Sequence, residues 1–366
     1  MRPIDERDTT FSRMALVEGT DQYREYYERR PEFEARDKEV RDASFAGILS
    51  RMMPDACFDE VPDRLAALEH IVDGNVAMIF ASMEMVKKAP ISARRLGIPP
   101  DEITPIIKEV ALYYGADMVG IVKMRDEHFY THHGRKMAGK YGDLVGKSLR
   151  YAIVLAVEMD RDMINRAPHL EEILATDRGY RDAALAGAGV AIHLKSLGYH
   201  AFLNTDACYN APLVRLARDA GLGQIGRHGM LITKRYGSRV RLGAVMTDMP
   251  LVPDKKVDFG LDEFCKRCDN CSRSCPGAAI SGGEPVDDEG QLRWGYDDAN
   301  CMEVWKKVGT DCGICIASCP FSHNIDEELI NSMKDDPAVI DRIIADYRQR
   351  FGSRPLVEEK LPIARL

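Results

Sequence analysis

The residues that most clearly point to chemistry in this chain are cysteines, and eight of the ten lie between Cys265 and Cys319. They form two runs that both end in Cys-Pro: Cys265-x2-Cys268-x2-Cys271-x3-Cys275-Pro276 and Cys301-x10-Cys312-x2-Cys315-x3-Cys319-Pro320. Cysteines separated by two residues allow three thiolates of one loop to bind adjacent irons of a cubane, but such a loop cannot reach the fourth corner. The spacing therefore predicts two [4Fe–4S] clusters.

In two-cluster ferredoxins the cysteine before the proline binds the other cluster. This rule predicts one cluster held by Cys265, Cys268, Cys271 and Cys319, and a second held by Cys275, Cys301, Cys312 and Cys315. The alternative is a pair of four-cysteine zinc sites. Zinc usually takes separated Cys-x2-Cys pairs and needs neither the third cysteine nor the Cys-Pro ending, so iron–sulfur clusters are favoured. The remaining cysteines, Cys57 and Cys208, are expected to be buried apolar residues.

Two adjacent clusters carry electrons and are not by themselves a catalyst, so the long segment before Phe264 should house a redox acceptor or a substrate site. The glycines Gly221-x-Gly223-x-x-Gly226 match the spacing of a dinucleotide-binding loop. They follow a helical pattern and precede a strand, however, which is the reverse of the order that such a loop requires. The sequence gives no support to a nicotinamide-binding site.

Short apolar runs predict strands, and segments with helical spacing alternate with them, which indicates an α/β domain. We expect strands at 118–122, 152–157, 201–203, 230–233 and 240–246, and helices at 63–88, 101–114, 180–197 and 211–220. Residues 325–351 predict an amphipathic helix, or a pair broken at Pro337. The expected parts are an N-terminal wrapping arm (1–60), the α/β domain (61–258), the cysteine module (259–325) and a helical tail (326–366).

The composition is that of an ordinary globular protein, with 45% hydrophobic and 30% charged residues. The net charge of −8 disfavours nucleic acid as a partner. No apolar run approaches the ~18 residues of a membrane-spanning helix. Residues 1–13 lack the apolar core of a secretory signal, and Arg29-Arg30 is not followed by the apolar run of a twin-arginine signal. We expect a cytoplasmic protein without a membrane span; an export signal removed ahead of this sequence stays open.

Several segments resemble corrinoid-dependent reductive dehalogenases. They are the two cysteine runs, the phrase AGLGQIGRHG at 220–229, and the stretches 237–242 and 247–251. Smaller agreements occur at 5–13, 158–160, 198–199, 259–260 and 264–265, so the resemblance covers essentially the whole chain.

The resemblance implies an oxidoreductase of the α/β (α+β) class, with a nitroreductase-like domain that binds cobalamin base-off beside a ferredoxin-like module. In that family electrons pass from an outer to an inner cluster and then to cobalt, a carbon–halogen bond breaks, and halide leaves. The implied partners are a small organohalide substrate and an external low-potential electron donor, such as a ferredoxin, a flavodoxin or a reductase. A homodimer stays open.

Carried over residue by residue, the resemblance assigns the proton donor to Tyr180, which follows Gly179 at the start of the Ala-rich helix, and the supporting cation to Arg241. A phenol with a pKa of about 10 keeps its proton at neutral pH and donates it when a cation stabilises the resulting anion. The third polar position falls near Asn204 and Asp206, and the register favours Asp206. The resemblance also implies cobalamin contacts at Asn204, Gly221, Gly223, Gly226, Arg227 and His228.

Other interpretations stay open. Without the resemblance, Tyr180 would be a packing residue and Arg241 a solvated strand residue. Epoxyqueuosine reductase, a tRNA-modifying enzyme, shares the corrinoid domain and the twin clusters. It requires a basic surface and usually has a C-terminal helical-repeat segment, and neither is expected from this sequence. The chain could also be a noncatalytic electron-transfer protein, whose α/β domain would serve docking only; corrinoid content separates that class from the enzymes.

Overall fold

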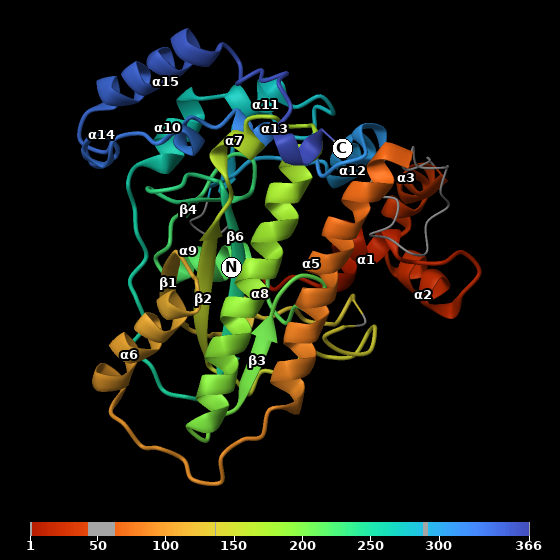
Figure 1. The fold of residues 1–366 in the computed structure, drawn as a ribbon. Coiled ribbons are helices and arrows are strands. Elements are labelled where there is room, and N and C mark those ends of the chain that lie inside the picture. The colour runs from red at the N-terminus through yellow and green to blue at the C-terminus, as the bar shows by residue number, and fades with distance from the viewer. Residues whose placement is uncertain (1, 43–62, 136, 288–291, 366) are drawn as a thin grey trace.

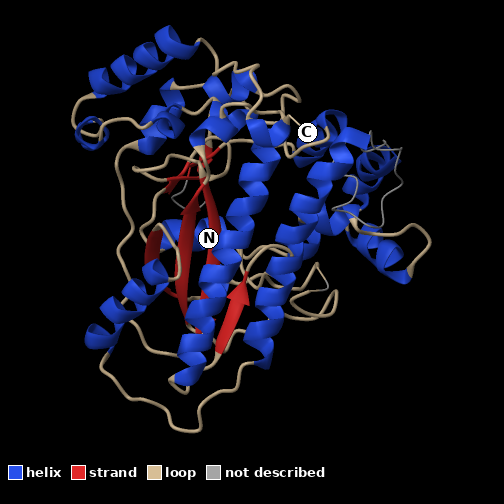
Figure 2. Cartoon of the chain, viewed as in Figure 1, coloured by secondary structure: helices blue, strands red, loops and turns tan. Residues whose placement is uncertain are grey.

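A four-stranded sheet lies at the centre of the computed structural model, which describes residues 2–42, 63–135, 137–287 and 292–365 (Figures 1 and 2). Its strand order is β1-β2-β6-β3, and every neighbouring pair is antiparallel. The strands are β1 (Met118–Lys123), β2 (Tyr151–Glu158), β6 (Val240–Thr247) and β3 (Ala201–Asn204). They lie where the apolar runs predict them. The antiparallel pairing assigns the sheet to the α+β form of the expected fold class.

Strand β2 is almost continuously apolar because both faces of the sheet are covered. Ile153 and Leu155 pack into one core cluster, with residues of helices α6 (Pro100–Tyr113) and α8 (Leu170–Ser196). Val154 and Ala156 pack into another cluster, with residues of helix α9 (Leu213–Asp219). Alternate side chains of a strand point to opposite faces, so a strand that is buried on both sides shows no polar alternation.

Helix α8 runs along the sheet, and helix α5 (Asp63–Lys88) packs on its other side (Figure 1). The predicted start of this helix was wrong: α8 begins at Leu170, so Tyr180 lies in the interior of the helix and not at its end. Gly179 is needed for the close approach of α8 to the sheet, because a Cβ atom there would lie 2.8 Å from Cγ of Arg241. After α9 the chain forms a small hairpin of β4 (Gln224–Ile225) and β5 (Leu231–Ile232).

The cysteine module and the tail cover one end of the sheet, at the top of Figure 1. Their helices are α10 (Leu261–Arg267), α11 (Asn270–Ser274), α12 (Asp298–Val308), α13 (Ile314–Ala317), α14 (Glu327–Ser332) and α15 (Pro337–Phe351), with a hairpin of β7 (Val286–Asp287) and β8 (Leu292–Arg293). The N-terminal arm carries α1 (Thr10–Met14), α2 (Asp21–Arg29) and α3 (Pro31–Asp42). Short elements complete the chain: α7 (Arg161–Ile164), η1 (Glu6–Asp8), η2 (Asp126–His128), η3 (Pro320–His323) and η4 (Pro362–Ala364).

Buried polar contacts join the cysteine module to the sheet. Arg239, which is 1% exposed, donates hydrogen bonds to the backbone oxygens of Ser322 (2.8 Å) and Met159 (2.6 Å). Gly237 adopts φ +58°, and a Cβ atom there would lie 2.3 Å from the carbonyl of Phe321. The segment just before β6 therefore contacts the segment that follows Cys319 directly.

Two remaining predictions concern single features of the chain. Cys208 is buried, as predicted, and Cys57 lies outside the described residues. Within the described ranges, no helix combines the length and the apolar character needed to cross a membrane.

Candidate functional site

A cavity of about 240 Å³ lies between β6, α8, α9 and the segments that connect them. Its polar lining consists of three tyrosines, two arginines and a serine: Tyr130, Tyr180, Tyr209, Arg135, Arg241 and Ser238. The apolar lining includes Leu213, Val214, Met230, Leu231 and Leu242. An apolar cavity with a few convergent polar groups is the usual form of a small-molecule site.

Tyr180 and Arg241, which were predicted from separate segments, lie side by side in this cavity. Cζ of Arg241 is 4.8 Å from the centre of the Tyr180 ring, within the range of a cation–π interaction. The Arg241 side chain is only 16% exposed, so the alternative of a solvated strand residue was wrong. Its side chain lies on the face of β6 that α8 covers, where Gly179 of α8 approaches Cγ of Arg241 closely.

Three further residues complete the surroundings of Arg241, and the sequence did not single them out. Nη2 of Arg241 donates to Oγ1 of Thr176 at 2.8 Å and to Oδ2 of Asp311 at 3.2 Å. The Thr176 hydroxyl in turn donates to Oε1 of Glu172 at 3.2 Å. Glu172, Thr176 and Tyr180 are spaced by four residues and therefore share one face of α8.

The environment keeps the Tyr180 phenol protonated at neutral pH. Burial raises the pKa of Tyr180 above its ordinary value of 10.0, and the Arg241 guanidinium opposes this shift. Burial, and then the adjoining Asp311 carboxyl, raises the pKa of Glu172 well above its ordinary value. Two carboxyl groups, of Glu172 and Asp311, thus lie close to the Arg241 guanidinium, and Asp311 pairs with it directly.

The candidates for the third polar position lie close to the cavity but do not line it. Asp206 is one-third exposed; its Oδ1 lies 3.5 Å from the Tyr209 hydroxyl and 3.8 Å from Nη1 of Arg135. Asn204 is fully buried, and its Oδ1 accepts a hydrogen bond from the Asn210 amide at 2.8 Å. The cavity residue on this segment is Tyr209, which the sequence did not single out.

The predicted cobalamin contacts divide into two groups. A Cβ atom at Gly221 would clash with the backbone of Lys255. A Cβ atom at Gly223 or Gly226 would clash with Ile232. Arg227 points toward the cysteine module, where Nη2 donates to the Cys265 carbonyl at 2.8 Å. These four residues have packing roles that need no ligand.

Asn204 and His228 are different, because each has a buried polar atom without a partner among the described residues. These atoms are Nδ2 of Asn204 and Nε2 of His228. Burial lowers the pKa of His228 to about 4, so its ring is neutral and its Nδ1 accepts a hydrogen bond from the Met230 amide at 3.2 Å. Buried polar groups normally find partners, so both atoms suit a ligand with amide side chains, such as a corrinoid.

The cysteines fall into two groups by their mutual electrostatic effects. Besides burial, the thiols of Cys319, Cys271 and Cys268 raise the pKa of Cys265. Cys315 is likewise affected by burial and by Cys312, Cys301, Cys271 and Cys275. Cys271 is the one member of the first group that also acts on Cys315. The ligands of a cubane bind different irons and therefore lie further apart than the ligands of one ion. Among the described residues, no group of three or more His, Cys, Asp or Glu is close enough to hold a single ion.

Both groups of thiols approach the cavity, because Ser238, which lines it, hydrogen-bonds the Cys319 thiol of the first group. Asp311, which pairs with Arg241, directly precedes Cys312. The first group lies toward α15, where Cys319 and Cys268 raise the pKa of the buried Tyr347 after the larger effect of burial.

Asp177, the neighbour of Thr176 on α8, leads to a prediction about pH and stability. It is 2% exposed and accepts a hydrogen bond from Asn75, and burial raises its pKa from 3.8 to about 7. Between these values the folded chain holds a proton that the unfolded chain has lost, so stability falls as pH rises through this window and is constant above it.

The variant Asp177→Asn keeps an acceptor for Asn75 and cannot ionise. When the pH rises from about 5 to 8, we expect the free energy of unfolding to fall by about 2–4 kcal/mol more in the native chain than in Asp177→Asn. Anaerobic thermal unfolding of both chains at the two pH values measures this. Equal changes in the two chains would contradict the proposed burial of the Asp177 carboxyl.

Comparison with known proteins gives a family for the cysteine module and relatives for most of the chain. Residues 264–323 match the family described as 4Fe-4S dicluster domain. The tetrachloroethene reductive dehalogenase of Sulfurospirillum multivorans is 30% identical over 272 residues, which cover 64% of this chain and 54% of that protein. The epoxyqueuosine reductase of Lactococcus garvieae is 31% identical over 168 residues, which cover 42% of this chain and 46% of that protein.

A solved structure of the catabolic reductive dehalogenase NpRdhA, in complex with 3-bromo-4-hydroxybenzoic acid, superposes on 96% of this chain with a TM-score of 0.73 and 21% sequence identity. The match covers 47% of that structure, so the chain spans about half the length of these relatives. The predicted fold class is confirmed, as is the iron–sulfur nature of the cysteine module. The resemblance indicated by the motifs is confirmed as well, because the relatives include reductive dehalogenases.

Proposed function

We propose that this chain, a relative of the reductive dehalogenases, is itself an oxidoreductase that replaces a halogen of an organohalide by hydrogen. The balanced reaction consumes the organohalide, two electrons and one proton, and releases the dehalogenated product and a halide ion. The observation that carries the proposal is the Tyr180–Arg241 pair in a substrate-sized cavity, connected through Asp311 to the loop of the second group of cysteines. A proton source and an electron path thus meet at one place.

Tyr180 supplies the proton in this proposal. Its raised pKa ensures that the phenol is protonated when the substrate arrives, and the adjacent Arg241 stabilises the phenolate that remains. Asp311 and Thr176 hold the Arg241 guanidinium in place. The Arg241 side chain is only 16% exposed, and low exposure to water strengthens the attraction between the cation and the developing anion.

The electrons come from an external low-potential donor and travel through two clusters. We assign Cys265, Cys268, Cys271 and Cys319 to the outer cluster, and Cys275, Cys301, Cys312 and Cys315 to the inner one. The proximity of the thiols within each group supports this crossed assignment. The position of Asp311 between Cys312 and Arg241 supports the order.

A bound corrinoid would supply the low-potential metal centre at which a carbon–halogen bond is cleaved reductively. We assign Asn204 and His228 to holding the corrinoid, because each has a buried polar atom without a partner among the described residues. The cavity itself is assigned to the substrate, because its volume suits a small molecule and is too small for a corrinoid. The base-off state, the electron donor, the homodimer and the cytoplasmic location stay predictions from the sequence.

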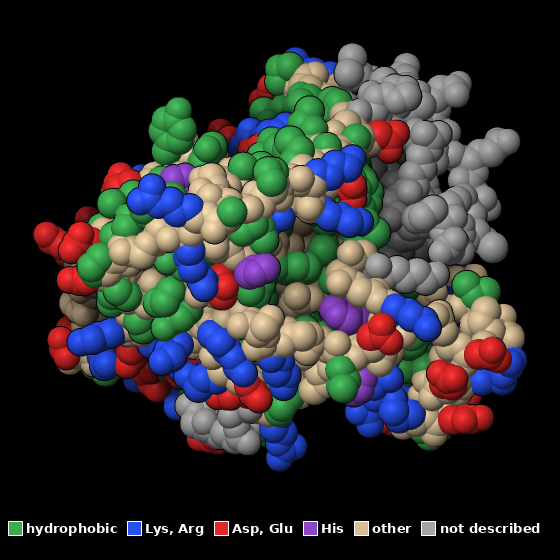
Figure 3. Space-filling view, turned by 90° about the horizontal axis from the view of Figure 1, so that it is seen from below, with side chains coloured by type: hydrophobic (Ala, Val, Ile, Leu, Met, Phe, Trp, Pro, Cys, Tyr) green, Lys and Arg blue, Asp and Glu red, His purple; other side chains and the backbone are tan. Residues whose placement is uncertain are grey.

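Epoxyqueuosine reduction is the second candidate, because one relative carries that name. A tRNA substrate requires a concentrated basic surface. On the face shown in Figure 3, Lys and Arg side chains lie among Asp and Glu, and the whole chain carries a net charge of −8. Both features favour a small organohalide.

The test is halide release by the full chain after anaerobic loading with iron, sulfide and a cobalamin. Reduced methyl viologen serves as the electron donor, with tetrachloroethene and 3-bromo-4-hydroxybenzoic acid as substrates. We expect halide with at least one of them, and none from protein that was loaded without cobalamin. Absence of halide from fully loaded protein, together with reduction of an epoxyqueuosine-containing tRNA stem loop, would overturn the proposal.

A further inference from the structure

A second phenol–guanidinium group lines the same cavity. Cζ of Arg135 lies 5.2 Å from the centre of the Tyr209 ring, and both side chains line the cavity together with Tyr130. The reaction proposed above uses Tyr180 and Arg241 and gives no role to this second group. A neutral chlorinated ethene offers this second group neither a charge nor an oxygen atom as a partner.

One donor of the Arg135 guanidinium is unsatisfied in the part of the chain that the structure describes. The side chain is 22% exposed, and its Nε is buried without a hydrogen-bond partner there. The guanidinium forms ion pairs with Glu6 and Asp206, each at 3.8 Å, which is beyond hydrogen-bond distance, and the facing Oε1 of Glu6 also has no hydrogen-bond partner among the described residues. A buried donor without an acceptor costs about 1–3 kcal/mol, and a ligand oxygen would recover this cost.

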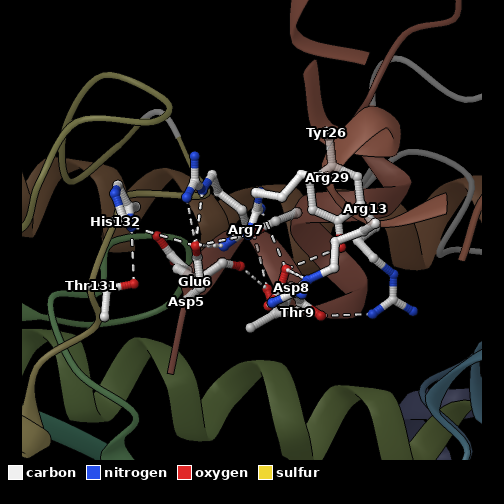
Figure 4. A network of polar contacts seen from close by, with 12 residues as sticks. Asp5, Glu6, Arg7, Asp8, Thr9, Arg13, Tyr26, Arg29, Thr131 and His132 are labelled. Atoms are coloured by element: carbon white, nitrogen blue, oxygen red, sulfur yellow. Dashed lines mark hydrogen bonds and ion pairs between the residues drawn. The ribbon is translucent and has the colours of Figure 1, made fainter. Parts of the chain in front are cut away.

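The N-terminal arm contacts the loop that carries Arg135, and Figure 4 shows Asp5 and Glu6 of this arm beside Thr131 and His132 of that loop. Oε2 of the buried Glu6 accepts hydrogen bonds from the backbone amides of Gly134 (2.7 Å) and Arg135 (3.2 Å). A Cβ atom at Gly134 would lie 2.5 Å from the Glu6 carbonyl carbon, so the loop and the arm are in direct contact. The Phe11 ring lies 5.0 Å from Cζ of Arg135 and fixes the guanidinium from another side.

We propose that Arg135, with Tyr209, determines substrate specificity by binding an oxyanion substituent, a phenolate or a carboxylate, of a halogenated aromatic substrate. This inference rests on the proposed function and names its substrate class. A charge-assisted hydrogen bond from a guanidinium to an oxyanion is among the stronger polar contacts. The cavity volume fits one substituted benzene ring, because a cavity of about 150 Å³ already admits benzene.

The apolar lining supports the same class of substrate. Leu213, Met230 and Leu242 offer a surface for an aromatic ring, and the cations offer partners for its charged substituent. Tetrachloroethene has neither a charge nor an oxygen atom and would leave the Arg135 donors without a partner. A site built to hydrogen-bond its substrate discriminates against a molecule without that group, because its buried donors would then stay unpaired.

The test measures binding without turnover. Isothermal titration of the loaded full chain with 4-hydroxybenzoate, which has no halogen, gives the affinity for the oxygenated ring. We expect Arg135→Gln to weaken this binding about 10- to 100-fold, as the loss of a charged hydrogen bond predicts. Arg135→Lys, which keeps the charge, should lie between the two. Arg150→Gln is the matched control, because Arg150 is 46% exposed and pairs with Asp126 outside the cavity.

Kinetics supply the second readout. Arg135→Gln should lower kcat/KM for 3-bromo-4-hydroxybenzoic acid relative to tetrachloroethene by a similar factor, with iron and cobalt per chain unchanged. Equal affinities of the native and Arg135→Gln chains, or loss of cobalt from the variant, would overturn the inference. Arg135-dependent binding without any halide release would contradict the proposed function alone, so the two failures are distinguishable.

Discussion

Replacing Tyr180 by Phe is expected to reduce halide release by about 100- to 10,000-fold, the usual contribution of a positioned general acid. The phenylalanine ring keeps the packing and the contact with the Arg241 guanidinium, which lies 4.8 Å from the ring centre. It removes only the proton that replaces the halide. Halide is measured by ion chromatography under anaerobic conditions, and iron and cobalt per chain are measured in parallel.

Tyr113→Phe is the matched control, because the Tyr113 side chain on α6 is 85% exposed and distant from the cavity lining. It should turn over at the native rate. If Tyr180→Phe also releases halide at the native rate with its metals intact, Tyr180 is not the proton donor. Loss of cobalt in Tyr180→Phe would instead indicate a role in holding the corrinoid.

Single cysteine variants test the crossed ligand assignment, because each should lose one of the two clusters. Cys275→Ala should lose most of the inner cluster, about four of eight irons, and leave the outer cluster intact. Cys265→Ala should do the reverse, although both residues belong to the same sequence run. The reason is proximity in the fold: beyond burial, the pKa of Cys265 is raised by thiols of its own group, and Cys275 acts on Cys315 instead.

Iron analysis and the EPR spectra of the dithionite-reduced variants measure this effect. Cys315→Ala should give the same spectrum as Cys275→Ala, and Cys208→Ala should keep both clusters because Cys208 belongs to neither group. Identical spectra from Cys265→Ala and Cys275→Ala would show that each run binds its own cluster and that the assignment is wrong.

Features set by local sequence could be predicted. The apolar runs of β2 and β6 are too short and too β-branched for helices, and the spacing of the cysteines is a property of single loops. The start of α8 could not be placed, because its first turns carry Glu171 and Glu172. These residues are buried by tertiary contacts with Leu361 and Asp311, which lie far away in the sequence.

The candidate site divides in the same way. Tyr180 and Arg241 came from resemblance to a family, and the fold brings them together. The neighbours Glu172 and Thr176 could have been found from their four-residue spacing before Tyr180. Asp311 and Arg135 could not, since each lies on a loop that the fold brings to this region, Asp311 against Arg241 and Arg135 into the cavity lining. For Arg135 the holding residue, Glu6, is 128 positions from its hydrogen-bond donor Gly134.

The most direct test of the central claim, that two clusters and a corrinoid meet beside Tyr180, is EPR combined with metal analysis on the anaerobically loaded full chain. We expect about eight irons and one cobalt per chain, a base-off Co(II) signal, and two reducible clusters, of which the inner one broadens the cobalt signal when it is reduced. Zinc in place of iron, or protein that binds no cobalt after loading, would contradict the central claim.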